Sequence, residues 1–276
     1  MLPPPLRQFI RLSAKISLPF IVAFAYLTLM LFLPIGAVCQ KALTEDWADI
    51  WRIATDRVAI SAYEVSFGTA LVASLLNGVF GTLLAWVLIR HDFPLRRIFD
   101  ALIDIPFALP TAVAGLTLST VYSPQGWIGA LFPYVQISFS RLGVGVAMVF
   151  VSLPFVVRTV QPVLMDLEKD TEEAAACLGA DRFQICFRVI LPAILPAILT
   201  GIALGFSRAV GEYGSTVLIA SNLPYRDLIA PVLIIQRLEQ YDYAGATVIG
   251  LVLLLFSFVS LLVINLLQVW GRRYEA

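Results

Sequence analysis

Long apolar stretches, separated by short charged loops, are the feature that most constrains the fold of this chain. The clearest stretch runs from Ala244 to about Leu267 and contains the unbroken apolar run Val248–Phe256. A helix that crosses a bilayer needs about 20 mainly apolar residues. Only 14% of the 276 residues are charged, whereas soluble domains have about 25%. The sequence therefore predicts an all-α, polytopic membrane protein and argues against a soluble enzyme or a disordered chain.

Six transmembrane spans are predicted, and together they make residues 1–276 a single membrane domain. Their ranges are 18–38, 61–89, 98–121, 142–164, 193–220 and 244–267. The first span is longer than the core of a secretory signal and has no small-residue cleavage site after it, so we expect it to be retained. Prolines interrupt the third and fourth spans, and we expect them to mark kinks, at Pro106, Pro110, Pro154 and Pro162.

Basic residues are unevenly distributed over the predicted loops. The N-terminal tail, the second-to-third loop, the fourth-to-fifth loop and the C-terminal tail together hold 11 lysines and arginines, against 6 in the remaining loops. Cytoplasmic loops of membrane proteins carry the excess of such residues. We therefore expect both termini to lie in the cytoplasm.

The residue types that metal binding and covalent chemistry require are sparse. The three cysteines, Cys39, Cys177 and Cys186, form no CxxC pair, and His91 is the single histidine. We expect no metal site, no cofactor and no catalytic residue, and we expect His91 to be a solvated interfacial residue. None of the three lysines lies in a GxxxxGK[ST] motif, so the chain should not bind ATP in the usual way. The net charge of zero gives no indication of a nucleic-acid partner.

The predicted loop over residues 165–192 is unusually long, charged and helix-forming. Apolar residues at helical spacing predict a first helix, in which the small side chains of 174–176 would let a partner approach closely. Gly179 predicts the end of that helix, and a second short helix is expected over 181–189, ending at Leu191-Pro192. These residues leave two interpretations open: a solvated hairpin between two spans, or a docking element.

The same loop contains Glu173-Ala174-Ala175, followed by Gly179, Val189 and Leu191-Pro192. At these spacings the residues resemble the EAA loop of ABC importer permeases, in which isoleucine is usual at the position of Val189. The resemblance implies the type I ABC importer permease architecture. It also implies that this loop docks on a separate ATPase subunit that hydrolyses ATP. The residues expected to couple the two proteins are Glu172, Glu173, Ala174, Ala175, Gly179, Leu191 and Pro192.

Three charged residues lie inside the fourth and fifth predicted spans. Arg158 is late in the fourth span, and we expect it to snorkel toward the interface. Arg208 and Glu212 lie within the fifth span, four residues apart and so on one helical face. A charge at membrane depth is expensive and by default marks a functional site. Either the two form a structural ion pair, or Arg208 faces a pore for an anion. Arg208, Glu212 and Ser215 are therefore the candidate residues of a substrate pathway.

A narrower resemblance surrounds these charges. Arg208, the segment 211–215 and the segment 221–225 are similar to the oxyanion branch of ABC importer permeases, and 238–247 and 264–268 are similar to the T subunit of sulfate/thiosulfate permeases. The resemblance implies a bacterial inner membrane location and three kinds of protein partner: a homologous second permease subunit, two ATPase subunits and a periplasmic sulfate-binding protein. Pairing with a second copy of this chain, transport of molybdate or another oxyanion, and an ion-coupled secondary transporter stay as alternatives.

Overall fold

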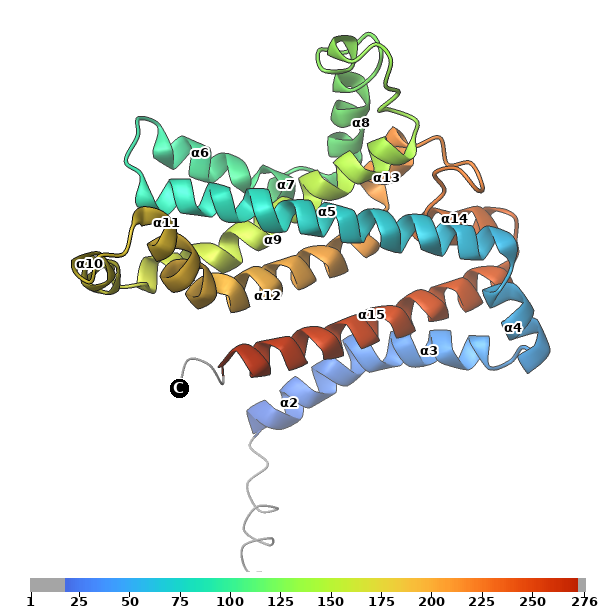
Figure 1. Cartoon of the computed structure of the whole chain (residues 1–276). Coiled ribbons are helices and arrows are strands. Elements are labelled where there is room, and N and C mark those ends of the chain that lie inside the picture. The colour runs from blue at the N-terminus through green and yellow to red at the C-terminus, as the bar shows by residue number, and fades with distance from the viewer. Residues whose placement is uncertain (1–17, 273–276) are drawn as a thin grey trace, which may run out of the picture. The chain divides into compact units, whose positions relative to one another are not determined.

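The computed structural model describes residues 18–272, and all the regular secondary structure described there is helical (Figure 1). The N-terminal basic tail and Arg273, which contribute to the predicted orientation, lie outside the described residues. The chain divides into two compact units, residues 1–52 and residues 53–276. Five described helices are long and apolar enough to cross a membrane.

The first unit contains the first of these helices. α2 (Leu18–Leu27), a π-helical turn η1 (Thr28–Phe32) and α3 (Leu33–Ala42) follow one another without a break, which confirms the first predicted span and extends it to Ala42. None of the residues in its most apolar window is buried. α4 (Trp47–Ala54) begins after a short turn.

The second unit is built on three helices that pack against one another: α5 (Arg57–Arg90), α9 (Arg141–Asp166) and α12 (Leu191–Val210) (Figure 1). Buried small residues such as Ala62, Ala70 and Ala73 on α5 allow the close approach that membrane helices use. α15 (Tyr243–Arg272) packs against α12 and against α14 (Ala230–Glu239). These helices confirm the second, fourth and sixth predicted spans.

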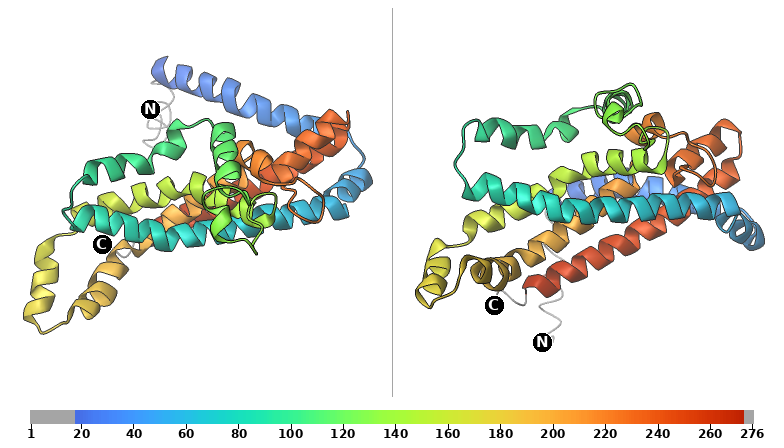
Figure 2. Two further views of the ribbon diagram at one scale, coloured as in Figure 1. Left: turned by 90° about the horizontal axis from the view of Figure 1, so that it is seen from above. Right: turned by 45° about the horizontal axis from the view of Figure 1, so that its top comes forward.

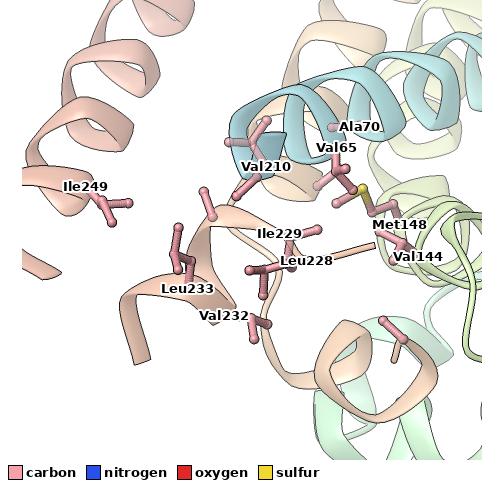
Figure 3. Packing of buried hydrophobic residues seen from close by; sticks show 14 of the residues in the cluster. Val65, Ala70, Val144, Met148, Val210, Leu228, Ile229, Val232, Leu233 and Ile249 are labelled. Carbon is pink, nitrogen blue, oxygen red and sulfur yellow. The ribbon is translucent and has the colours of Figure 1, made fainter. Parts of the chain in front are cut away.

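Two buried apolar clusters hold the second unit together. The first joins α5, α9, α14 and α15, and includes Val65, Met148, Leu233 and Ile249 (Figure 3). The second lies where the end of α5 meets the end of α9 and the start of α12. The two clusters fix the three central helices at two levels along their length.

The third predicted span is wrong, because residues 98–121 form no single helix. They are divided among α6 (Arg96–Ile103), α7 (Ile105–Ala108) and α8 (Thr111–Val121). Leu109, which precedes Pro110, is extended with ψ 134°, as steric conflict with the following proline ring favours. The prolines thus separate helices where kinks were expected. α8 stands at a steep angle to α5 and α9 (Figure 1) and packs against α13 (Gly214–Ile219).

Two predicted helix boundaries near the fifth span are also wrong. α12 ends at Val210 and α13 begins at Gly214, so the predicted span 193–220 is broken. The predicted stop at Leu191-Pro192 is absent, because α11 (Arg182–Ile185) continues through a π-helical turn η3 (Cys186–Ile190) into α12. The π-helical turn ends two residues before Pro192, whose missing N–H interrupts the α-helical hydrogen-bond ladder.

Candidate functional site

The segment 165–192 folds as a helical hairpin, as predicted. α10 (Lys169–Cys177) is followed by Gly179, whose φ of +87° is the left-handed conformation typical of a helix C-terminus. The Ala180 N–H then donates to the Ala175 carbonyl at 3.1 Å. Asp181 caps α11: its carboxylate accepts from the Gln184 N–H at 2.7 Å, and the Gln184 side chain accepts from the Asp181 N–H at 3.2 Å. This reciprocal capping box fixes the second arm of the hairpin.

The hairpin presents an exposed surface that carries both acidic and apolar side chains. α10 and α11 project past the end of α5 (Figure 2). Glu173 and Ala174 are exposed, and so are Leu178, Phe183 and Phe187. Exposed apolar residues rimmed by charges are typical of a protein-docking surface. The geometry therefore favours a docking element over a merely solvated connection.

Glu172 is held differently from the exposed Glu173. The Nη2 atom of Arg90, at the end of α5, lies 2.6 Å from the Oε1 atom of Glu172, and both side chains are largely buried. The guanidinium of Arg90 also lies 5.7 Å from the centre of the Trp86 ring, within range of a cation–π interaction. Arg90 was not predicted as a partner from the sequence. The only signal was a basic residue at the end of one span and an acidic loop 82 residues later.

The second candidate site lies at the break between α12 and α13. The Nη1 atom of Arg208 lies 2.7 Å from the Oε2 atom of Glu212, so the predicted ion pair forms. The other oxygen of Glu212 accepts hydrogen bonds at 2.9 Å from both the N–H and the Oγ–H of Ser215. The structure thus brings all three candidate pathway residues together, and the carboxylate of Glu212 joins the two helices across the break.

Burial distinguishes the members of this group. The Glu212 side chain is 2% exposed, whereas that of Arg208 is 32% exposed. Ser215 is fully buried because α8 lies directly against α13: a Cβ atom on Gly115 would be 2.4 Å from the Ser215 carbonyl oxygen. Only glycine at position 115 permits this approach. Arg208 is therefore the most exposed member of the group.

Arg158 has partners that were not predicted: its side chain binds the carboxylate of Asp100 on α6 and that of Asp104, the residue after α6. Its guanidinium contacts the Asp104 carboxylate at 2.6 and 2.9 Å, and the Asp100 carboxylate at 2.7 Å. Gln161 also donates to Asp100, at 2.9 Å. Burial raises the pKa of Asp100, but the hydrogen bonds from Gln161 and Arg158 outweigh it and place the pKa below its usual value. Two acids inside the predicted third span would need a partner at membrane depth, and that signal was overlooked.

Replacing Arg158 with glutamine is expected to loosen α6 from α9. The change removes charged hydrogen bonds that each contribute about 1.5–3 kcal/mol, so the melting temperature of the purified chain in detergent should fall by several degrees. The matched control is Arg52→Gln, because the Arg52–Asp49 pair is exposed and should contribute little. Equal melting temperatures for both variants would contradict the structural role of Arg158.

The remaining predictions concern His91, the cysteines and metal binding. His91 is exposed after α5, and the three cysteines are free thiols. Within the described residues, no group of three or more histidines, cysteines and acids could hold a metal ion.

A further residue that was not predicted from the sequence is Asp227. Its fully buried carboxylate accepts from the N–H of Ser221 at 2.6 Å and from that of Leu223 at 3.1 Å. It orders the loop that contains the 221–225 motif.

This fold and its exposed hairpin define a class of membrane transport protein. The sequence profile described as "Binding-protein-dependent transport system inner membrane component" matches residues 77–273. The chain belongs to that family. Its relatives are named as permeases, which agrees with the prediction of a transport subunit and not an enzyme.

More particular relatives are the sulfate transport system permease proteins CysT. The protein of that name from Synechocystis sp. is 61% identical over 274 residues, which is 98% of this chain and 96% of the relative. The Synechococcus elongatus protein is 62% identical over 95% of each chain. A probable sulfate transport system permease protein from Nephroselmis olivacea is 58% identical over 94% of this chain and 92% of the relative.

Solved structures agree on the fold. A bacterial ABC transporter that imports the acidic polysaccharide alginate contains a chain with a TM-score of 0.72 and 17% identity, over 98% of this chain and 97% of that one. A chain of the MetNI methionine ABC transporter has a TM-score of 0.54 and 19% identity, over 83% of this chain and 97% of that one. The predicted all-α, polytopic permease architecture of ABC importers is therefore confirmed.

Proposed function

We propose that this chain is the membrane-spanning subunit of an ATP-driven importer for sulfate, with thiosulfate as a related substrate. The observation that carries the proposal is the identity of 61% with a sulfate permease over nearly the whole chain. The whole of residues 1–276 acts as one permease domain in the bacterial inner membrane, with both termini in the cytoplasm. Its partners are a homologous second permease subunit, two ATPase subunits and a periplasmic sulfate-binding protein.

The helical hairpin and the charged group suggest how ATP hydrolysis drives transport. The ATPase docks on α10 and its neighbours Gly179, Leu191 and Pro192. From α11 the helix runs through η3 and α12 without interruption, 29 residues from Arg182 to Val210. Displacement of the hairpin therefore moves Arg208 as part of a rigid body, a recognised type of switching motion.

The charge balance at the break suits an oxyanion that must pass without being trapped. Arg208 offers a partly exposed guanidinium, and the adjacent Glu212 neutralises much of its charge. Conduction requires a site attractive enough to enter and weak enough to leave. Tight selection of the anion is left to the binding protein. A molybdate permease is the second candidate, because the same residues fit any tetrahedral oxyanion.

The test is uptake of labelled sulfate in cells that lack this chain, with and without a plasmid that restores it. We expect uptake to fall to background without the chain, to return with it, and to be inhibited by vanadate. Excess thiosulfate should compete more strongly than molybdate. Stronger competition by molybdate would favour the second candidate, and uptake that depends on a proton gradient but not on ATP would contradict the ABC mechanism.

A further inference from the structure

Arg90 is placed to connect the hairpin to the helical bundle. It is the last residue of α5, the helix that packs against both α9 and α12. Its ion pair with Glu172 joins this helix to α10. No comparable ion pair is found for Glu173, the glutamate of the EAA-like motif, among the described residues. The two neighbouring glutamates therefore have different surroundings.

Burial makes this ion pair more than an incidental surface contact. The side chains of Arg90 and Glu172 are 11% and 25% exposed, whereas fully solvated pairs contribute little to stability. The Nε atom of Arg90 is buried and has no hydrogen-bond partner in the described part of the chain. Glu172 is thus the carboxylate that compensates a largely desolvated guanidinium, and losing it leaves a buried charge unpaired.

The backbone alone does not hold α10 in place. Leu167 and Glu168, which connect α9 to α10, are extended, with ψ angles of 109° and 130°. On its other side α10 packs mainly on α11 and η3, which belong to the same hairpin. A side-chain contact with a central helix is therefore needed to fix the orientation of α10 relative to the bundle.

We propose that Arg90 is a positioning residue for energy coupling, which holds α10 against the end of α5 through Glu172. This inference rests on the proposed function. Movement of the docked hairpin then displaces α5 together with α12, although only α12 is continuous with the hairpin. Glu173 stays free to meet the ATPase, while Glu172 faces inward and anchors the helix that carries both.

The experiment uses the complete transporter, reconstituted with its ATPase and binding protein. It tests the single variants Arg90→Gln and Glu172→Gln, and the double variant Arg90→Glu plus Glu172→Arg, in which the two charges are exchanged. The readout is the number of ATP molecules hydrolysed per labelled sulfate transported. Each single variant should raise this ratio about fivefold, the lower range of a coupling free energy between two sites, and the exchange should restore it. The matched control is Arg96→Gln, since Arg96 pairs with the fully exposed Asp92.

The outcomes separate this inference from the proposed function. Unchanged ratios in both assembled single variants would overturn the role of Arg90, while wild-type sulfate transport continued. A wild-type complex that moves no sulfate would instead overturn the proposed function. If the single variants do not assemble with the ATPase, the charge exchange decides: recovery of assembly and coupling supports the inference, and failure of both overturns it.

Discussion

Replacing Gly179 with valine is expected to reduce sulfate uptake about tenfold, while ATP hydrolysis by the docked ATPase continues. The φ angle of Gly179 is +87°, and an L-residue with a Cβ atom loses roughly 1–2 kcal/mol in a left-handed conformation. No atom lies within 4 Å of the position that a Cβ would take, so the expected effect comes from the backbone and not from a clash. A penalty of about 1.4 kcal/mol changes a conformational population tenfold.

Two control variants test whether the left-handed backbone conformation of Gly179 causes the expected effect. Gly179→Asn should retain much of the uptake, because asparagine visits the left-handed region more readily than other side chains. Gly68→Ala should have little effect, since Gly68 lies inside α5 with open space around its Cβ position. Uptake and ATP hydrolysis are measured in the reconstituted complex. Equal uptake by the valine and asparagine variants would show that the turn conformation is unimportant.

Replacing Glu173 with glutamine tests the docking surface itself. The side chain is exposed, so the melting temperature of the chain should not change. Sulfate uptake should nevertheless fall, because the carboxylate is expected to face the ATPase, and hydrolysis should become uncoupled from transport. Normal ATP-driven uptake by both this variant and Gly179→Val would mean that the hairpin is not the coupling element.

The success of the span predictions and their failure in the third span have one physical origin. Apolar length identifies a segment that can lie in hydrocarbon, and it located the helices that begin at Leu18, Arg57, Arg141 and Tyr243. It does not report whether the backbone of that segment is continuous. Residues 98–121 are apolar enough on average, but Pro106 and Pro110 divide them into three helices. Hydropathy therefore identified this region as apolar but did not show that its backbone is divided into three helices.

Whether a contact of the candidate site could be predicted depended on how far apart its two residues lie in the sequence. The Arg208–Glu212 pair was predictable because four residues bring two side chains to one helical face. The hairpin was predictable because Gly179 and the acidic residues act on their immediate neighbours. By contrast, Arg90 and Glu172 are 82 residues apart in the sequence, and Arg158 and Asp104 are 54 residues apart. Their register depends on packing, which a single sequence does not encode locally.

Removing the carboxylate of Glu212 should prevent stable assembly of the permease. In Glu212→Ala, the N–H and Oγ–H of Ser215 lose their acceptor in a fully buried position, and Arg208 loses its counter-charge. Breaking a buried, hydrogen-bonded pair in this way costs on the order of 3 kcal/mol. The measurement is the amount of intact complex extracted from membranes. Glu212→Gln keeps an acceptor for Ser215 and should assemble better than the alanine variant.

Neutralising both charges separates a structural role from a role in conduction. In the double variant Arg208→Gln, Glu212→Gln, no unpaired charge remains, and the glutamine at position 212 can still accept from Ser215. If the pair is only structural, this variant should transport sulfate at nearly the wild-type rate. If Arg208 also serves the passing anion, uptake by the assembled complex should fall roughly tenfold, the effect of about 1.4 kcal/mol on a barrier.

We expect the second result, because the two charges differ so much in exposure. A purely structural pair has no need to leave its guanidinium 32% exposed while the carboxylate is 2% exposed. The control is Arg237→Gln: that arginine is 30% exposed and also binds two carboxylates, Asp56 and Asp242, but lies on α14 outside the candidate spans. Loss of uptake in the double variant, with uptake retained in Arg237→Gln, would place the guanidinium of Arg208 on the anion pathway. Wild-type uptake in the double variant would leave the pair as a brace between α12 and α13.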